Sequence, residues 1–245
     1  MKKEHYLNIP VDVLSLADIL QEVPHYIEEN KQMTITSVNP QIVLEAHHYP
    51  EVVHYIERAT YRLPDGIGIV KASQLCEGEI VERVTGVDVM MALLDYANVH
   101  HEKIFLYGAK ATVVKKAADV ITRDYPGLEV VGAVDGYGSV DDETLVSLIN
   151  RSKATFLFVA KGFPLQEEWL ARHCEKLNVN IIEDVGGSFD VISGAVSRAP
   201  EWIQRLNLEW LYRSVTQKGR LGRIAQLPVF LWQVKKEYNM KKRKG

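Results

Sequence analysis

The chain has 245 residues, of which 47% are hydrophobic and 25% are charged, and its net charge is −3. This composition excludes a disordered protein, and no apolar run reaches the ~18 residues that a transmembrane helix requires. The two cysteines, Cys76 and Cys174, provide neither a disulfide framework nor the spacing of a metal site. The N-terminus has acidic residues within its apolar part and no small-residue cleavage site, so we expect a cytoplasmic protein. The length predicts one large domain or two small ones.

In chain order, the sequence alternates between strand-like and helix-like segments. Short β-branched and apolar runs predict strands, and apolar residues at helical spacing predict the helices between them. The expected elements are a strand at 32–38, a helix with Asn39 as N-cap and Pro40 as first residue, a strand at 60–64, a helix over 65–76, a helix capped by Thr85, a strand at 103–108, a helix at 111–124, a strand at 128–134, a helix at 141–151, a strand at 154–160, a helix at 164–177 and a strand at 179–185. Near-continuous apolar strands with intervening helices predict an α/β fold, with a Rossmann-like, mostly parallel sheet flanked by helices on both faces.

Function in such a sheet gathers in the loops after the carboxyl ends of the strands, above all at a topological switch point. One of these loops contains Pro64-Asp65-Gly66. This tripeptide is a good turn by itself, because Pro fixes φ, Asp bonds its own backbone and Gly accepts a positive φ. The local sequence therefore leaves Asp65 open between a turn residue and an acid at a reaction centre.

Several familiar chemistries lack their motifs. The chain has no G-x-G-x-x-G after a strand, no P-loop, no G-x-S-x-G elbow and no D-x-D. Gly108, before a helix, could still offer backbone N–H groups to a phosphate, which keeps a nicotinamide-dependent nucleotide-sugar oxidoreductase open as an alternative. Other polar residues have ordinary structural interpretations when taken singly: Arg83 as a surface ion pair, Gln166 and Glu167 as first-turn helix residues, and Asp190 as a cap.

Taken together, six motifs resemble the TagA/WecG/CpsF family of bacterial glycosyltransferases. They are "TSVNPQIV", "LPDGIGIV", "ERVTGVDVM", "FLYGAK", "GFPLQEEW" and "VGGSFDVISGAVSRAPEWIQRLNLEWLYR", which run in the family's order from about Thr34 to Arg223. The resemblance implies an inverting, metal-independent transferase without a cofactor, which moves a sugar from a UDP-sugar to undecaprenyl-diphosphate-linked N-acetylglucosamine at the cytoplasmic membrane face. The most similar branch transfers N-acetylmannosamine in synthesis of the wall teichoic acid linkage unit, and other relatives use the uronic acid of that sugar.

The resemblance also assigns roles to residues of this chain. It implies that Asp65 is the general base, that Arg83 binds substrate phosphate or sugar, and that Gln166 is a polar group of the sugar pocket. The family's T-x-N motif appears here as Ser37 and Asn39, which keeps the hydroxyl group and loses a methyl group. The remaining candidate substrate-binding residues are Gly66, Gly108, Asp135, Tyr137 (a candidate for stacking on uracil), Glu167, Asp190, and the arginines Arg213, Arg220 and Arg223, which match family residues that close over the diphosphate.

The implied chemistry is consistent with these residue types. An inverting displacement needs one base and no covalent intermediate, so a single carboxylate such as Asp65 is sufficient. An ordinary Asp is a weak base, with a pKa of ~3.9, and burial would raise this pKa. Without a metal ion, cationic side chains must stabilise the leaving diphosphate, and the forked guanidinium of Arg binds phosphate oxygens better than Lys does.

The charge distribution sets the C-terminus apart. From Arg213 to the end the chain has ten Lys and Arg residues and one acidic residue, whereas residues 1–212 have 19 basic and 31 acidic residues. We expect a catalytic domain over 1–212 and a basic amphipathic appendage over 213–245. Trp232 on an apolar face between basic ends predicts a helix in the interface of an anionic membrane, and hence a peripheral protein on the inner face of the cell membrane. A helix packed on the body or a homo-oligomer contact is the alternative, and no nucleic-acid partner is expected. A non-catalytic nucleotide sensor recruited to the membrane, which would bind UDP without turnover, also stays open as an alternative function.

Overall fold

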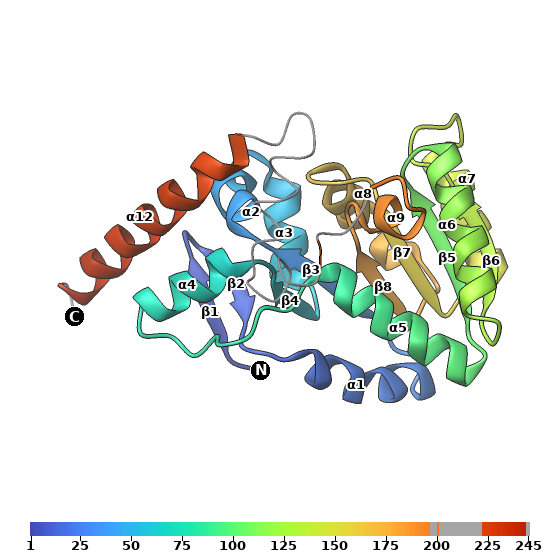
Figure 1. Cartoon of the computed structure of the whole chain (residues 1–245), viewed down its shortest axis with the longest axis horizontal. Coiled ribbons are helices and arrows are strands. Elements are labelled where there is room, and N and C mark those ends of the chain that lie inside the picture. The colour runs from blue at the N-terminus through green and yellow to red at the C-terminus, as the bar shows by residue number, and fades with distance from the viewer. Residues whose placement is uncertain (197–199, 201–221, 244–245) are drawn as a thin grey trace.

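The computed structural model describes residues 1–196, 200 and 222–243, and its centre is a parallel sheet (Figure 1). Six strands follow the order β4-β3-β8-β7-β5-β6, and every adjacent pair is parallel. The strands are β3 (Met33–Val38), β4 (Tyr61–Pro64), β5 (Lys103–Gly108), β6 (Glu129–Val134), β7 (Phe156–Ala160) and β8 (Ile181–Asp184). Each predicted strand is present, and the predicted α/β sheet is confirmed.

Helices cover both faces of this sheet. They are α1 (Leu16–Glu28), α2 (Pro40–Glu45), α3 (Pro50–Arg58), α4 (Ile67–Leu75), α5 (Gly86–His100), α6 (Ala111–Asp124), α7 (Asp142–Ser152), α8 (Leu165–His173), α9 (Ser188–Ile192) and α12 (Gly222–Lys242), with short 3₁₀ turns η1 (Ala46–His48) and η2 (Cys174–Lys176). One core cluster joins α1, α5 and α6 to one sheet face, and another joins α3, α7 and α8 to the opposite face. Side chains of β5 alternate between them: Leu106 belongs to the first cluster and Phe105 and Tyr107 to the second.

The helices start where their capping residues predict. The side chain of Asn39 accepts a hydrogen bond from the backbone N–H of Ile42 at 3.1 Å, and Pro40 is the first residue of α2. Thr85 likewise caps α5 and Asp141 caps α7. Because Asn39 directly follows β3, its cap fixes the loop at the carboxyl end of that strand.

An N-terminal hairpin was not predicted from the sequence. It consists of the antiparallel strands β1 (Lys3–Tyr6) and β2 (Ile9–Asp12). With α2, α4 and α12 it forms a third core cluster. In this cluster the rings of Tyr6 and Phe230 pack in a T-shaped arrangement, with their centroids 6.2 Å apart. The hairpin therefore provides the surface on which the C-terminal helix rests.

Helix α12 packs on the body of the protein with one of its faces. Phe230 and Val234 are buried, and the Lys235 ammonium donates to the carbonyl oxygen of Leu75 at 2.6 Å. Its basic end makes an ion pair between Lys242 and Glu77 at 2.9 Å. The expected boundary between residues 212 and 213 lies outside the described residues. Within the part of the chain that the structure describes, no helix combines the length and apolar character needed to cross a membrane.

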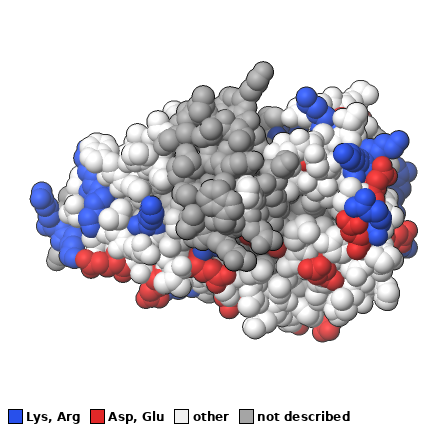
Figure 2. All heavy atoms as spheres, viewed as in Figure 1, with Lys and Arg blue, Asp and Glu red and all other residues white. Residues whose placement is uncertain are grey.

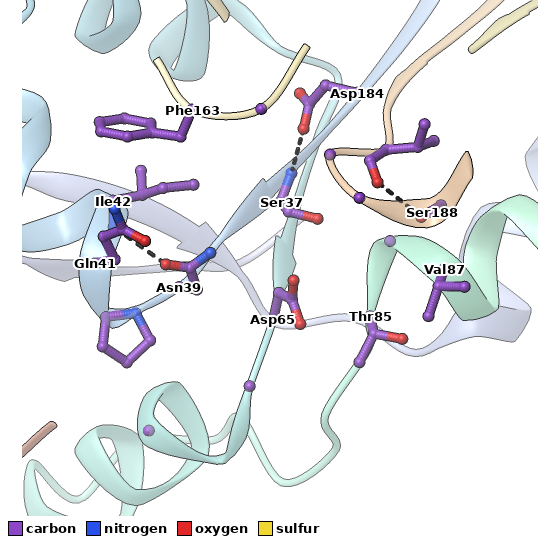
Figure 3. A pocket seen from close by; sticks show the side chains of 18 of the residues that line it. Ser37, Asn39, Gln41, Ile42, Asp65, Thr85, Val87, Phe163, Asp184 and Ser188 are labelled. Atoms are coloured by element: carbon purple, nitrogen blue, oxygen red, sulfur yellow. Dashed lines mark hydrogen bonds between the residues drawn. The ribbon is translucent and has the colours of Figure 1, made fainter. Parts of the chain in front are cut away.

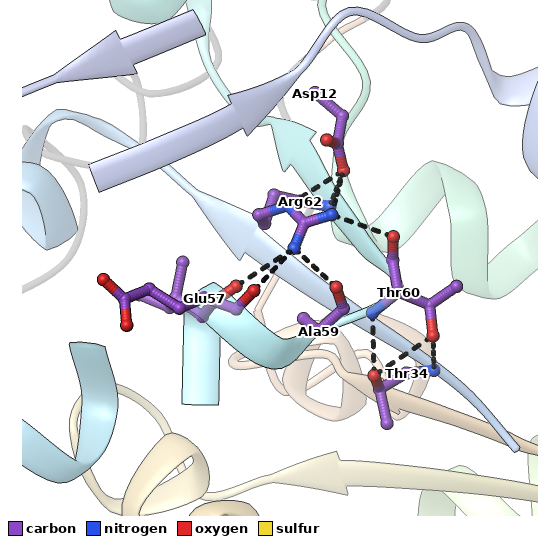
Figure 4. A network of polar contacts seen from close by, with 7 residues as sticks. Asp12, Thr34, Glu57, Ala59, Thr60 and Arg62 are labelled. Carbon is purple, nitrogen blue, oxygen red and sulfur yellow. Dashed lines mark hydrogen bonds and ion pairs between the residues drawn. The ribbon is translucent and has the colours of Figure 1, made fainter. Parts of the chain in front are cut away.

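A buried ion pair joins the hairpin to the sheet (Figure 4). Arg62 on β4 is 3% exposed, and its Nη2 and Nε atoms lie 2.9 and 3.0 Å from Oδ2 of the buried Asp12. The same guanidinium donates to the carbonyl oxygens of Ile56, Glu57, Ala59 and Thr60 at the end of α3. One cation thus ties β2, α3 and β4 together.

We expect Asp12→Ala to lower the free energy of unfolding by about 3–5 kcal/mol, because it leaves the Arg62 charge buried without its counter-ion. Urea denaturation at neutral pH measures the change. The matched control is Asp124→Ala, which removes an exposed pair with Arg123 (2.7 Å) and should change the free energy by less than about 1 kcal/mol. Equal, small effects of the two substitutions would contradict the structural role given to Asp12.

Candidate active site

A cavity of about 290 Å³ opens at the carboxyl ends of β3, β4, β7 and β8 (Figure 3). The chain passes outward from β3 to β4 and later returns to the other side of β3 as β8, so the cavity lies at a topological switch point of the sheet. Seven residues singled out from the sequence line this one cavity: Ser37, Asn39, Asp65, Gly66, Arg83, Gln166 and Glu167. The fold thus brings together residues up to 130 positions apart in the chain.

Asp65 stands on the turn between β4 and α4, beside the end of β3. Its backbone N–H donates to the carbonyl oxygen of Val38 at 3.0 Å, and its half-buried side chain lies at the cavity. The following residue, Gly66, has a φ of 95°, a conformation that favours glycine. A Cβ atom at Gly66 would meet no atom of the described residues within 4 Å, so with respect to them the backbone beside Asp65 faces open space.

Ser37 and Asn39 flank Asp65 from the neighbouring strand. The Ser37 N–H donates to Oδ1 of Asp184 at 3.3 Å, while Asn39 both caps α2 and lines the cavity. A Cβ atom on Gly86 would lie only 2.9 Å from the Ser37 hydroxyl oxygen. Gly86, the first residue of α5, therefore allows the helix N-terminus to approach the end of β3 closely.

Arg83 reaches the cavity from the segment that precedes α5. The next residue, Val84, donates its N–H to the carbonyl oxygen of Pro64 at 3.2 Å, which fastens this segment to the end of β4. Arg83 and Asp65 consequently line the same cavity although they come from different loops. A guanidinium here is suited to bind a phosphate group of a ligand.

Buried acidic groups form the inner wall of the cavity. Glu167 and Asp184 line it. Glu183, the neighbour of Asp184 on β8, lies behind this lining and is fully buried, and among the described residues neither of its carboxyl oxygens has a hydrogen-bond partner. Sequence reasoning missed Asp184 and Glu183. The available signal was the apolar segment "VNIIEDV", in which two acids end a strand that is covered on both faces.

Burial changes the protonation of these acids. It raises the pKa of Glu167 to about 7 and raises the pKa values of Glu183 and Asp184 well above the ordinary range. The negative charge of Glu167 raises the pKa of Asp184 further, and the charges of Asp184 and Asp65 do the same for Glu183. Burial therefore favours the protonated forms of these three acids, because their charged forms are poorly solvated there.

Four other candidate residues lie outside the cavity lining. Gly108 packs against Ala160, where a Cβ atom would lie 2.4 Å from the carbonyl oxygen, and Asp135 accepts a hydrogen bond from the N–H of Tyr137 at 3.0 Å. Tyr137 is 68% exposed, and Asp190 belongs to the short helix α9. Their roles in substrate binding remain predictions. Arg213 and Arg220 fall outside the described residues, and of Arg223 the structure describes the backbone, in α12, but not the side chain.

The described ranges, 1–196, 200 and 222–243, contain no group of three His, Cys, Asp or Glu side chains placed to hold a metal ion.

A parallel α/β sheet with a polar cavity at its switch point is an architecture of enzymes that bind nucleotides. Comparison with known sequences narrows the class: the chain belongs to the Glycosyl transferase WecG/TagA/CpsF family, whose model matches residues 4–244. It is thus a glycosyltransferase, as its motifs predicted.

Two relatives are similar over nearly their whole length. An N-acetylglucosaminyldiphosphoundecaprenol N-acetyl-beta-D-mannosaminyltransferase of Bacillus subtilis (strain 168) is 38% identical over 246 residues, which cover 99% of this chain and 94% of the relative. An enzyme of the same description from Staphylococcus aureus (strain NCTC 8325 / PS 47) is 32% identical over 236 residues, which cover 96% and 92% of the two chains.

The raised pKa of Glu167 predicts a specific dependence of stability on pH. Because this pKa rises from 4.5 to about 7 on folding, the contribution of Glu167 is fully present below pH 4.5 and is lost as the pH rises through about 7. In the wild-type protein the free energy of unfolding should fall between about pH 5 and pH 8. We expect this fall to be smaller in Glu167→Gln, by up to about 3 kcal/mol. Urea denaturation across this range measures it, and an unchanged pH dependence would contradict the assignment.

Proposed function

We propose that this chain transfers N-acetylmannosamine from UDP-N-acetylmannosamine to undecaprenyl-diphosphate-linked N-acetylglucosamine, a step in making the linkage unit of wall teichoic acid. The observation that carries the proposal is the 38% identity, over nearly the full length of both chains, to the Bacillus subtilis enzyme whose name states this sugar and this acceptor. The cavity supports it, since it places a carboxylate, a guanidinium, a hydroxyl group and a side-chain amide around one space.

In the proposed reaction, Asp65 is the general base. The acceptor hydroxyl attacks the anomeric carbon of the donor sugar, its proton passes to the Asp65 carboxylate, and UDP leaves from the opposite face with inversion at that carbon. Open space at Gly66 allows the sugar to approach the backbone beside the base. Ser37 and Asn39 line the cavity at the neighbouring strand end, and in this proposal they hold sugar hydroxyl or acetamido groups.

Negative charge builds up on the diphosphate as the bond to the sugar breaks. Arg83 is the cavity-lining residue that we assign to this charge, because a guanidinium donates two parallel hydrogen bonds to phosphate oxygens. By family resemblance, Arg213, Arg220 and Arg223 add further positive charge. No metal ion is assigned to the step in this proposal.

We expect Asp65→Asn to lower transfer by about 10²- to 10⁴-fold, since the amide keeps the size of the side chain but does not accept the proton. Binding of UDP, measured by calorimetry, should stay within a few-fold of wild type, because the base acts on the acceptor hydroxyl rather than on the nucleotide. Transfer is measured with a short-chain lipid-diphosphate-N-acetylglucosamine acceptor. Wild-type transfer by Asp65→Asn would refute the role of this residue.

The same assay, run with a panel of UDP-sugars with and without EDTA, tests the reaction itself. UDP-N-acetylmannosamine should be the preferred donor, and EDTA should not reduce the rate. A preference for the uronic acid donor, or a requirement for a nicotinamide cofactor, would replace the proposal with one of the alternatives that the sequence left open.

We further propose that residues 1–212 form the catalytic unit and that α12 in the C-terminal appendage contacts the inner face of the cell membrane. Val229, Trp232, Lys236 and Met240 follow one another at helical spacing on the outer side of α12, and Trp232 is 63% exposed. Figure 2 shows Lys and Arg side chains gathered at this end of the molecule. An exposed apolar row with basic neighbours suits an interface rich in anionic lipid.

We expect Trp232→Ala to weaken binding to vesicles that contain anionic lipid by about tenfold, because the indole ring no longer enters the interface. Cosedimentation measures the binding, which should also weaken at high salt. Tyr137→Ala is the matched control, since Tyr137 is similarly exposed but lies at the loop after β6. Equal binding by the Trp232 and Tyr137 variants would count against membrane contact by α12. Deleting residues 213–245 is a poorer test, because Phe230 belongs to the core.

A further inference from the structure

The side chain of Gln166 is committed to four hydrogen bonds within the protein. Its Oε1 atom accepts from the backbone N–H groups of Gly162 at 3.0 Å and Gly186 at 3.1 Å. Its Nε2 atom donates to Glu167 Oε1 at 3.1 Å and to Asp184 Oδ1 at 3.2 Å. A side-chain amide has two donor hydrogens and two acceptor lone pairs, so these four bonds use its full capacity. Only 4% of the residue is exposed.

This arrangement leaves Gln166 no group with which to bind a sugar, although it lines the cavity. A hydrogen bond to a ligand would require breaking one of the four internal bonds and leaving a buried polar group unpaired. The structure therefore gives Gln166 a role different from the sugar contact that family resemblance implies.

The four bonds connect separate loops of the site. Gly162 lies in the loop after β7 and Gly186 in the loop after β8, and both have a positive φ (74° and 50°). In the part of the chain that the structure describes, no atom lies within 4 Å of a Cβ position at either glycine. Asp184 extends the connection to β3, because its Oδ1 also accepts the N–H of Ser37 at 3.3 Å. Figure 3 shows Asp184 reaching back to Ser37 across the strand ends.

We propose that Gln166 and Asp184 are positioning residues, which together hold the end of β3 and the loops after β7 and β8 at the spacing that the transfer step requires. Gln166 acts by fixing the Gly162 and Gly186 peptides that border the cavity, and it makes no contact with the donor sugar. The effect on turnover rests on the proposed function, whereas the connection between the loops stands on the geometry alone.

A double-mutant cycle tests the proposal. Gln166→Met keeps the length of the side chain but removes all four of its hydrogen bonds. Asp184→Ala removes the oxygen that accepts both the Gln166 amide and the Ser37 N–H. Steady-state transfer at pH 6, where Glu167 retains a proton, gives kcat and KM, and thermal unfolding is followed in parallel.

We expect Gln166→Met and Asp184→Ala each to lower kcat by about 30-fold or more, and the double variant to lose clearly less than the product of the two single losses. The matched control is Gln32→Glu. The amide of Gln32 donates to the carbonyl oxygens of Cys174, Leu177 and Val179 at the amino end of β3, far from the cavity. This control should lower the melting temperature without changing kcat of the folded enzyme.

Two results would overturn the proposal. One is wild-type kcat in Gln166→Met, which would make the four bonds merely structural. The other is a loss in the double variant that equals the full product of the two single losses, which would refute the shared role. If Gln166→Met does not fold, Gln166→Glu replaces it in the same cycle.

Failure of the proposed function is recognised separately. If the wild-type protein transfers no sugar, hydrogen exchange of the Gly162 and Gly186 amides becomes the readout. Gln166→Met should speed exchange at both amides by about tenfold or more, and Gln32→Glu should leave both protected. Unchanged exchange in Gln166→Met would refute the connection between the loops whatever the reaction is.

Discussion

The position of β4, the strand that leads to Asp65, depends on the contacts of one buried cation, the guanidinium of Arg62. Arg62 is surrounded by the Asp12 carboxylate and by carbonyl oxygens at the end of α3. A guanidinium without these partners would be strongly destabilising at a buried position, so β2, α3 and β4 must meet around it. Arg62 holds β4 against β2 and the end of α3. In the register of β4 and β3, Arg62 lies opposite Thr36 and Pro64 lies opposite Val38. This register brings Asp65, which follows Pro64, beside the loop that contains Asn39.

This dependence explains which parts of the fold the sequence could predict. The central strands and the caps at Asn39, Thr85 and Asp141 rest on signals within a few residues, namely apolar runs and side chains that bond the next turn. The hairpin lacks such a signal. Its attachment depends on a pair between Asp12 and Arg62, fifty positions apart, and charged residues ordinarily suggest solvent-exposed positions.

The candidate site divides in the same way. Asp65 and Asn39 each directly follow a strand, and Ser37 is the residue before the last of its strand. They were predicted to lie together because the carboxyl ends of parallel strands share one edge of the sheet. Asp184 and Glu183 were missed because an acid that ends an apolar strand looks like the start of a loop. Sequence resemblance pointed to Gln166, but the role of this residue depends on four partners from three segments of the chain, which no local pattern reveals.

The acidic residues at and beside the cavity are of two kinds, which differ in how deeply they are buried. Glu167, Glu183 and Asp184 lie almost fully out of solvent, and burial raises the pKa of each, to about 7 for Glu167, which favours their neutral forms. Acids that hold their protons repel a diphosphate less than three ionised ones would, and so oppose the attraction of Arg83 less. Asp65 differs because it is half-buried on a turn at the cavity, where a ligand hydroxyl can reach it. Separate environments for neighbouring carboxyl groups allow one to accept a proton while the others hold theirs. These environments stay different only if the loops around the cavity keep their spacing. In this chain the amide of Gln166 connects the buried acid Asp184 to the loops of Gly162 and Gly186, which border the cavity.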